Sequence, residues 1–411
     1  MRAQGQFSED MSRWLTAEEV ADRLKIKRET VYAYVSRGRL RSRRADDGRG
    51  SVFNPADVER LSAKVKGARR RQPDVLESEI TLIAADDIYY RGHSARELAL
   101  TATFEQVACL LWGSTKATAV WVPSESTRRF CRKVIAELPS SVLPVDLIKV
   151  VAACVATVEP PDWDFTPDVI ATTAQRVLAT LLASLPEQSP PADAAAFAGP
   201  ASPMAALLWS RLCDRPPAEA EVKLLNATMI ILADHDLASA TFVARTAARA
   251  GVEPSGIVRL GIDVGSGPVK GAASLAIETL LHNLNSRDGV EAALTRRLRQ
   301  GDPIPGFGHP VYPEGDTRAS FILDELRKSH AGNERLATVE EVIQIQLRRG
   351  LPPPNAGFAL AALTYVLGMV PGAGEAIFVL SRAAGWIAHA IEEYNSEPLE
   401  RLQSVYVGPP V

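Results

Sequence analysis

The stretch PIPGFGHPVYPEGDTRAS, residues 303–320, is the most informative in this sequence. It places His309 in a turn between two glycines and a proline, where little room is left for other side chains. Arg318 follows nine residues later. A GFGH turn alone is a weak signal, but the full string is a strong one. We therefore expect the chemistry of this chain to lie in its second half.

Two neighbouring segments contain further candidate residues. In ILADHDLASATFVARTAARAG, residues 231–251, His235 lies between two aspartates at the start of an expected helix and can point into a cleft. For a single histidine, a local salt bridge is the plainer interpretation. In GSGPVKGAAS, residues 265–274, Lys270 is the one charged side chain in a run of small residues. The sequence leaves open whether Lys270 is catalytic, binds a ligand or does neither.

The composition is typical of a cytoplasmic globular protein. The 411 residues are 46% hydrophobic and 23% charged, and they suffice for two or three domains with a sizeable core. The start MRAQGQFSED lacks the apolar segment of a signal peptide, and no apolar run is long enough for a membrane span. The four cysteines are scattered, so we expect reduced thiols and no metal site.

The charge is distributed unevenly along the chain. Residues 1–72 have a net charge of +8, whereas the remainder has −11, which gives −3 in total at pH 7. A polyanionic partner is therefore expected for the N-terminal part only.

The N-terminal part has the pattern of a helix-turn-helix. In WLTAEEVADRLKIKRETVYAYVSRG, residues 14–38, Thr16 is a good N-cap for a first helix with apolar residues at helical spacing. The residues KIK then turn the chain into a second, basic helix. In that helix Val31 and Val35 face inward, and Gly38 is the expected C-cap. Two short helices joined by a tight turn are typical of DNA-binding modules.

A hairpin and a third helix complete this part. The turn ADDGRG, residues 45–50, joins two short extended segments, and Asn54 and Pro55 begin the next helix. Residues 13–63 resemble the winged helix-turn-helix of MerR-type regulators and phage excisionases. The resemblance implies double-stranded DNA as partner; the alternative is a protein-interaction module with a solvated basic face. The expected groove contacts are Arg28, Thr30 and Tyr32, and the expected phosphate contacts are Arg37, Arg39, Arg41, Arg43, Arg44 and Arg49.

From Val75 onward the pattern is mostly helical, apart from a short hairpin expected from ITLI and IYY. Six segments carry a resemblance to a known family: DIYYRGHSARELALTATFEQVACLLWG, ADHDLASATFVAR, GFGHPVYPEGDTRA, PPNAGFALAAL, SRAAGWIAHAIEE and PLERLQSVYVG. In this order they resemble the citrate synthase family over about residues 75–411. The resemblance implies a mostly α fold, a large and a small domain with a ligand cleft between them, and a homodimer.

The resemblance also implies a clamp for a dianionic keto acid. The family joins acetyl-CoA to oxaloacetate, and guanidiniums suit carboxylates while a histidine can polarise the ketone. His235 matches the family histidine that holds oxaloacetate, and His309 matches the one that polarises its carbonyl. The matching arginines are Arg318, Arg382 and Arg401, the last of which would reach in from the partner subunit. No cofactor is expected other than an acyl-CoA as co-substrate or ligand.

The family's enol-forming pair is replaced. Lys270 stands where the family has a proton-donating histidine, and Gly357 stands where it has the catalytic aspartate. Loss of a positioned general base typically costs about 10²–10⁴-fold in rate. A desolvated Lys270 can act as a base or stabilise an enolate, and as a fixed cation it can neutralise a carboxylate or a CoA phosphate. Glu278 or Glu375 is an alternative base.

Three functions follow from these observations. The first is a ligand-sensing transcriptional regulator that binds an oxaloacetate- or citrate-like dicarboxylate with degenerate catalysis. The second is an active citrate or 2-methylcitrate synthase with a substituted acid–base pair, and the third is an inactive partner of a true synthase subunit. The expected division is a winged helix-turn-helix and basic linker at 1–72, a large domain at 73–255 with 366–411 returning to it, and a small domain at 256–365.

Overall fold

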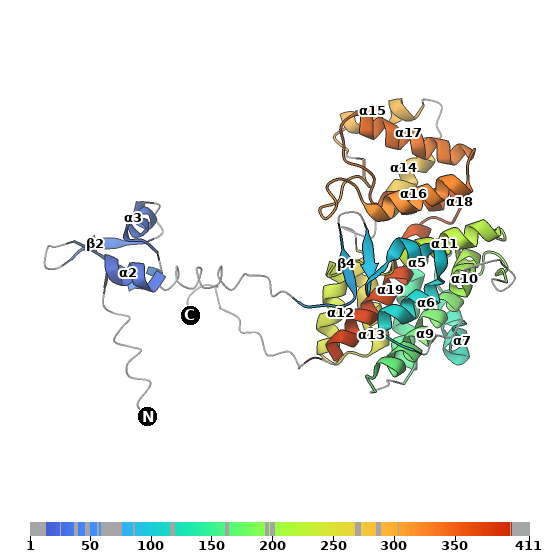
Figure 1. Cartoon of the computed structure of the whole chain (residues 1–411), viewed down its shortest axis with the longest axis horizontal. Coiled ribbons are helices and arrows are strands. Elements are labelled where there is room, and N and C mark those ends of the chain that lie inside the picture. The colour runs from blue at the N-terminus through green and yellow to red at the C-terminus, as the bar shows by residue number, and fades with distance from the viewer. Residues whose placement is uncertain are drawn as a thin grey trace. The chain divides into compact units, whose positions relative to one another are not determined.

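The chain forms two compact units, Met1–Glu77 and Ser78–Val411 (Figure 1). The structure is a computed structural model. It describes residues 14–24, 26–36, 40–45, 50–55, 57–58, 76–84, 87–115, 120–160, 164–193, 197, 202–267, 273–284, 289–302, 304–394 and 396.

The first unit contains the predicted helix-turn-helix. Helix α2 (Ala17–Leu24) begins after Thr16, whose hydroxyl accepts a hydrogen bond from the Glu19 amide at 3.3 Å. The Glu19 carboxylate accepts one from the Thr16 amide at 2.7 Å, which completes a capping box. Helix α3 (Arg28–Ser36) follows the turn. Both helices pack on one small core, formed by Leu15, Ala17, Val20, Leu24, Val31, Leu40, Phe53 and Val58.

The predicted hairpin is confirmed and belongs to a three-stranded sheet. Strands β2 (Ser42–Arg44) and β3 (Ser51–Phe53) pair antiparallel, with Arg43 opposite Val52. A short strand β1 (Leu15–Thr16), which the sequence did not predict, pairs with the other edge of β3 and gives the order β1-β3-β2. Gly38 and the hairpin turn at 46–49 lie outside the described residues.

The second unit begins with a small sheet and continues in helices, as predicted for a mostly α body. Strands β4 (Thr81–Ile83), β5 (Ile88–Tyr90) and β6 (His93–Ser94) pair antiparallel in that order, and β4–β5 is the hairpin expected from ITLI and IYY. The helices are α5 (Ala95–Thr101), α6 (Phe104–Trp112), α7 (Glu125–Ala136), α8 (Pro144–Val158), α9 (Pro167–Ser184), α10 (Pro203–Leu212), α11 (Glu219–Ile231), α12 (Ser239–Arg249), α13 (Pro254–Gly265), α14 (Ala273–Leu284), α15 (Val290–Arg299), α16 (Thr317–Ser329), α17 (Glu334–Arg348), α18 (Ala356–Leu367) and α19 (Ala373–Tyr394).

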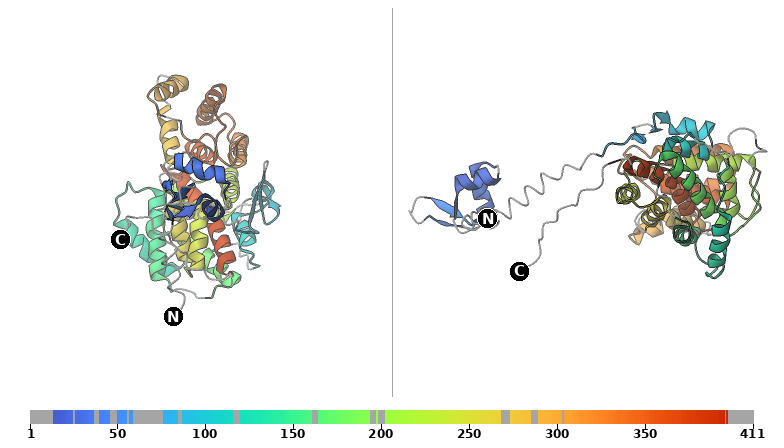
Figure 2. Two further views of the ribbon diagram at one scale, coloured as in Figure 1. Left: turned by 90° about the vertical axis from the view of Figure 1, so that its left-hand side faces the viewer. Right: turned by 90° about the horizontal axis from the view of Figure 1, so that it is seen from below.

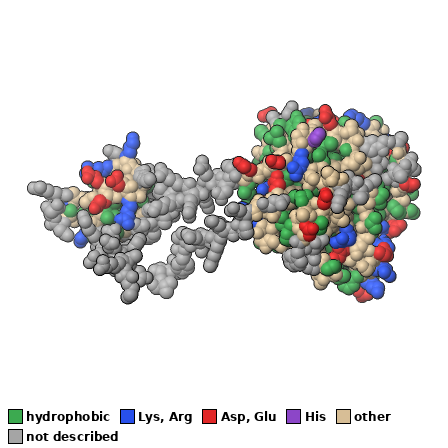
Figure 3. Space-filling model, turned by 60° about the horizontal axis from the view of Figure 1, so that its bottom comes forward, with side chains coloured by type: hydrophobic (Ala, Val, Ile, Leu, Met, Phe, Trp, Pro, Cys, Tyr) green, Lys and Arg blue, Asp and Glu red, His purple; other side chains and the backbone are tan. Residues whose placement is uncertain are grey.

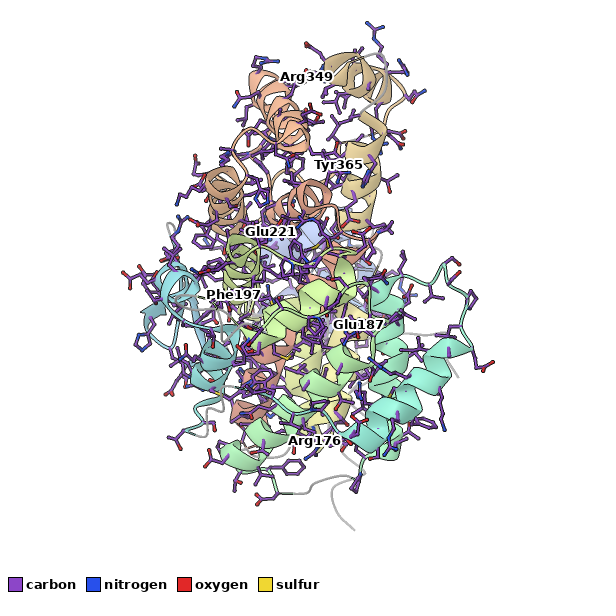
Figure 4. All side chains as sticks on the ribbon, turned by 90° about the vertical axis from the view of Figure 1, so that its right-hand side faces the viewer. Arg176, Glu187, Phe197, Glu221, Arg349 and Tyr365 are labelled. Carbon is purple, nitrogen blue, oxygen red and sulfur yellow. The ribbon has the colours of Figure 1, made fainter. Side chains whose placement is uncertain are left out.

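The helices of the body form two groups (Figures 1 and 2). In the smaller group α18 packs against α14, α16 and α17, and α15 packs against α17. In the larger group the 22-residue helix α19 packs against α6, α8, α9, α11, α12 and α13. Helices α14 and α18 also contact α19, so the two groups meet there. Arg349 marks the outer end of the smaller group, Arg176 lies at the opposite end of the body, and Glu221 lies near the junction (Figure 4).

The predicted boundary between the large and the small domain at residue 256 falls inside helix α13, and the domain division stays a prediction. This helix packs against α8, α9, α12 and α19 and so lies in the larger group. The cause is a glycine contact: a Cβ at Gly261 would lie 2.2 Å from the ring of Trp386, and Gly265 lies beside the same ring. Two glycines one turn apart thus let α13 lie against α19 at close range, and only the chain after α13 enters the smaller group.

The surface and the helix lengths of the body are unremarkable for a folded protein. On the face seen in Figure 3, acidic and basic side chains are interspersed with apolar ones. Within the described residues, no helix combines the length and apolar character needed to cross a bilayer.

Candidate functional site

His235 lies in the turn between α11 and α12, four residues before α12 begins at Ser239. Tyr90 holds this turn through its buried hydroxyl, which lies 3.2 Å from the carbonyl oxygen of Asp234. The Asp236 amide donates to the Asp234 carboxylate at 2.9 Å, and Asp236 has a φ of 51°, which is unusual for a residue with a side chain. Such strained turns are frequent at ligand sites. His235 itself is buried.

The GFGH turn is held against the segment that precedes α18. Gly306 and Gly308 have φ values of 92° and 77°, and a Cβ at Gly306 would lie 2.7 Å from a neighbouring side chain. The Gly308 amide donates to the Pro353 carbonyl at 2.8 Å, and the Asn355 amide donates to the Gly306 carbonyl at 2.8 Å. Asn355 Nδ2 also donates to the Gly308 carbonyl at 3.0 Å. These bonds fix the backbone that presents His309.

Arg318 is oriented by a carboxylate two residues earlier. Its Nε and Nη2 donate to the two oxygens of Asp316 at 2.9 and 2.8 Å, and both side chains are buried. Asp316 also accepts a bond from the Ala356 amide at 2.9 Å. Burial would raise the pKa of Asp316, but the bonds and charge of Arg318 outweigh burial and hold that pKa below its usual range. Arg318 Nη2 lies 3.5 Å from His309 Nε2.

Tyr312 brings the two histidines and Arg318 together. Its hydroxyl lies 2.9 Å from His235 Nε2, and its ring centroid lies 5.1 Å from that of His309. The Arg318 guanidinium stands over the same ring at 5.5 Å, and the two histidine rings are 5.5 Å apart and nearly perpendicular. Burial raises the pKa of Tyr312, so the phenol stays protonated. Tyr312 was not among the predicted site residues, although it lies within the string of residues 303–320.

Arg382 reaches the same place from α19. Its side chain is 3% exposed and stacks 5.2 Å from the ring centroid of Phe378. Among the described residues its Nε has no hydrogen-bond partner. Burial lowers the pKa of Arg382 to about 10, Asp234 opposes that shift, and the charge of Arg318 adds to it. Arg382 is therefore a cation at neutral pH, and the charge of Asp234 offsets only part of the cost of its burial.

The structure therefore brings His235, His309, Arg318 and Arg382 into one site around Tyr312. Gly357 lies next to it in the first turn of α18, half-buried, with its amide bonded to the Asn355 side chain at 3.0 Å. It offers backbone only. Lys270 and Arg401 lie outside the described residues.

The two alternative carboxylates lie at the start of α19. The Glu278 carboxylate accepts bonds from the Thr364 hydroxyl at 2.9 Å and from the amides of Gly372 and Gly374 at 2.8 and 3.2 Å. Burial raises the pKa of Glu278. Burial and the charge of Glu278 both raise the pKa of Glu375, whose Oε1 has no partner within the described residues. Glu278 thus fixes the connection between α18 and α19.

The described part of the chain holds no cluster of three or more metal-ligating side chains. In the first unit, the side chains of Arg28, Tyr32, Arg43 and Arg44 are exposed, and Thr30 is half-buried. Arg43 stands 4.7 Å over the Trp14 ring. Arg37, Arg39 and Arg49 lie outside the described residues.

Arg41, one of the predicted phosphate contacts, is paired with a carboxylate of the first unit. Its Nε and Nη2 donate to the carboxylate of Asp57 at 2.7 and 3.1 Å, and its amide donates there as well at 3.1 Å. Asp57 is buried at the start of the third helix. A buried carboxylate needs such donors, so Arg41 joins the hairpin to that helix, while its own side chain remains 66% exposed.

Two sequence models match the chain: the citrate synthase C-terminal domain over residues 70–403 and a helix-turn-helix domain over residues 14–64. Citrate synthase 2 of Bacillus subtilis is 29% identical over 199 residues, which span 47% of this chain and about half (53%) of that protein. The 2-methylcitrate synthase of Mycobacterium tuberculosis is 26% identical over 79% of this chain and 85% of that protein.

Solved structures agree on the fold. Citrate synthase of Thermotoga maritima superimposes with a TM-score of 0.62 at 23% identity, covering 82% of this chain and 94% of that chain. The Thermoplasma acidophilum enzyme, solved in a ternary complex with carboxymethyl coenzyme A and oxaloacetate, gives 0.64 at 20% identity, covering 84% and 97%. The fold and the matched residues define a helical protein of the citrate synthase class preceded by a helix-turn-helix domain. The chain belongs to the citrate synthase family.

Proposed function

We propose that this protein is a ligand-sensing transcriptional regulator whose body binds a dicarboxylate of the oxaloacetate or citrate type. The observation that carries the proposal is Arg382, a buried cation whose Nε has no partner within the described residues, in a site with His235, His309 and Arg318. A bound carboxylate would neutralise that charge and accept its donors. Acyl-CoA is a second ligand of this proposal.

The missing proton-transfer groups support a sensor over an enzyme. Gly357 has no side chain to remove a proton, and Lys270 replaces the donor histidine that the family resemblance places there. Glu278, one of the two alternative bases beside Glu375, already accepts three hydrogen bonds. We infer that this chain keeps the residues that bind the dicarboxylate while it lacks the family's residues that form the enol.

The helix-turn-helix domain supports DNA as the output of the sensor. Its match covers residues 14–64, and the same part of the chain carries the positive charge. We propose a homodimer, because a two-fold body suits a pseudo-palindromic DNA site. Light scattering on the purified chain tests this, and a monomer at micromolar concentration contradicts it.

A second candidate function is an active citrate or 2-methylcitrate synthase. It is favoured by the similarity to proteins named as such, which extends over 79% of this chain. In that case Lys270 would take over part of the acid–base work.

One experiment separates the two functions. Purified protein is mixed with oxaloacetate and either acetyl-CoA or propionyl-CoA, and free thiol is followed. The sensor predicts no release above background together with a rise in melting temperature on adding oxaloacetate or citrate. Turnover within the usual range of about 1–10³ s⁻¹ would establish the synthase instead.

The DNA part is tested by its dependence on salt. The full chain should bind duplex DNA with an affinity that falls steeply between low and physiological salt, because phosphate contacts release counterions. Absent or salt-independent binding contradicts the proposal.

A further inference from the structure

The body contains a buried chain of charged groups that begins at the anion site and ends where the linker from the DNA-binding unit enters. Asp234 precedes His235 of the site, and its turn is bonded to α19 three residues after Arg382, where the Gly385 amide donates to the Ala233 carbonyl at 3.0 Å. Asp234 Oδ2 lies 3.3 Å from His389 Nε2, and neither side chain has any exposed surface. The first link therefore joins the site to His389, in the C-terminal part of helix α19.

Arg245 of α12 provides the second link. Its Nη1 lies 3.0 Å from His389 Nδ1 and 2.6 Å from Glu392 Oε2. A guanidinium only donates, so His389 Nδ1 accepts and the ring proton lies on Nε2, facing Asp234. The donor and the acceptor of each of these hydrogen bonds are therefore defined.

Glu392 makes the third link, to the first residues of the body. Its Oε1 accepts a bond from the Glu79 amide at 2.8 Å and lies 3.4 Å from the Ser78 hydroxyl. These residues stand at the boundary between the two units and lead directly into β4. One carboxylate therefore holds Arg245 with one oxygen and the entry of the linker with the other.

We propose that this chain of hydrogen bonds, Asp234–His389–Arg245–Glu392–Glu79, transmits occupancy of the anion site to the linker of the DNA-binding unit. The inference rests on the proposed function for its ligand. An anion on Arg382 takes over part of the charge that this arginine shares with Asp234, so Asp234 binds the His389 Nε2–H more strongly. The ring then accepts more strongly from Arg245, Glu392 is less neutralised, and its bond to the Glu79 amide tightens.

Amide hydrogen exchange of residues 76–84 measures the far end of the chain. In the wild-type full-length protein, saturating oxaloacetate should slow exchange in this segment by about fivefold, the lower end of usual coupling between two sites. In Glu392→Gln the segment should exchange faster without ligand, and oxaloacetate should leave it unchanged. The matched control is Glu159→Gln. It breaks the 3.0 Å ion pair with Arg176, which lies outside this series of hydrogen bonds, and it should behave as wild type.

Separate readouts distinguish failure of the inference from failure of the proposed function. Thermal stabilisation reports whether oxaloacetate binds. If it binds and exchange in 76–84 does not change, or if Glu392→Gln responds as wild type does, the inference is overturned while the binding proposal stands. If oxaloacetate does not bind, the binding proposal fails, and Asp234→Asn decides the inference without ligand. That variant should speed exchange in 76–84 across the four hydrogen bonds that separate Asp234 from Glu79, and an unchanged rate overturns the inference.

Discussion

Arg318 and Arg382 face the same site, but Arg318 has its own carboxylate in Asp316, and Arg382 has none at its Nε within the described residues. The first arginine is neutralised before any ligand arrives. The second lies in a buried position that favours an anion, and burial lowers its pKa to about 10. Arg382 is thus the residue that most directly ties the fold of this body to the charge of its ligand.

Replacing Arg382 should abolish ligand binding without lowering the stability of the protein. In Arg382→Met the buried charge is gone, so the melting temperature without ligand should be equal to or above that of wild type. The stabilisation by oxaloacetate or citrate should disappear. Thermal unfolding with and without ligand checks both, with Arg327→Met, whose arginine is partly exposed and paired with Glu340, as control. A full ligand shift in Arg382→Met would show that the anion binds elsewhere.

Restoring the family's proton-transfer residues should create thiol release. The double variant Lys270→His with Gly357→Asp restores the two residues that the family resemblance assigns to the donor and the base, and each positioned group usually contributes about 10²–10⁴-fold. Release of free thiol from acetyl-CoA or propionyl-CoA should rise at least about tenfold over wild type. The single variants are the controls. Equal, measurable turnover in wild type and double variant would mean that the present residues already perform the chemistry.

Gly385 is a position where a single methyl group should disturb the site. A Cβ there would lie 2.1 Å from Asp234 Oδ1 and 2.7 Å from the Ala233 carbonyl. Gly385→Ala should therefore cost about 1–3 kcal/mol in the free energy of unfolding and weaken ligand binding. Gly267→Ala, whose Cβ would meet only a carbonyl at 3.5 Å, is the control. Denaturant unfolding measures the difference, and equal stability would argue against close contact of α19 with the Asp234 turn.

The Glu375 carboxyl should make stability depend on pH. Burial and the charge of Glu278 raise its pKa in the folded state above the unfolded value of about 4.3. Its contribution to stability is therefore complete below the unfolded pKa and is lost as pH rises through the folded pKa. Glu375→Gln should melt higher than wild type at pH 7–8, with the difference shrinking toward pH 4.5. Parallel profiles in thermal scans across this range would contradict it, and Glu340→Gln serves as control.

Two arginines of the hairpin should respond differently to alanine. Arg44 is exposed on β2, so Arg44→Ala should weaken DNA binding and reduce the slope of affinity against salt by about one phosphate contact. Arg41→Ala removes the side-chain donors of the buried Asp57 carboxylate and should lower the melting temperature of the first unit. Salt titrations and thermal unfolding of the full chain distinguish the two. Equal effects of both variants on the salt slope would contradict this assignment.

The helices, the hairpins and the family were predictable because local signals agreed: capping residues, helical spacing and six ordered segments. Contacts between residues far apart in the sequence were not predictable. Nothing near Arg41 in sequence indicates Asp57, and Gly261 does not reveal the Trp386 ring that places α13 in the larger group. Tyr312 was readable in the quoted string, but its role depends on His235, which is 77 residues away.

Asn355 has a consequence for how this protein can change over generations. Its Oδ1 accepts bonds from the amides of Gly357 and Phe358, and its Nδ2 holds the Gly308 carbonyl of the histidine turn. One side-chain amide thus sets the course of the backbone on both sides of position 357, whichever residue stands there. A lineage can discard the reactive group at this position and inherit the pocket intact, so that a catalyst and a receptor are separated by very few substitutions.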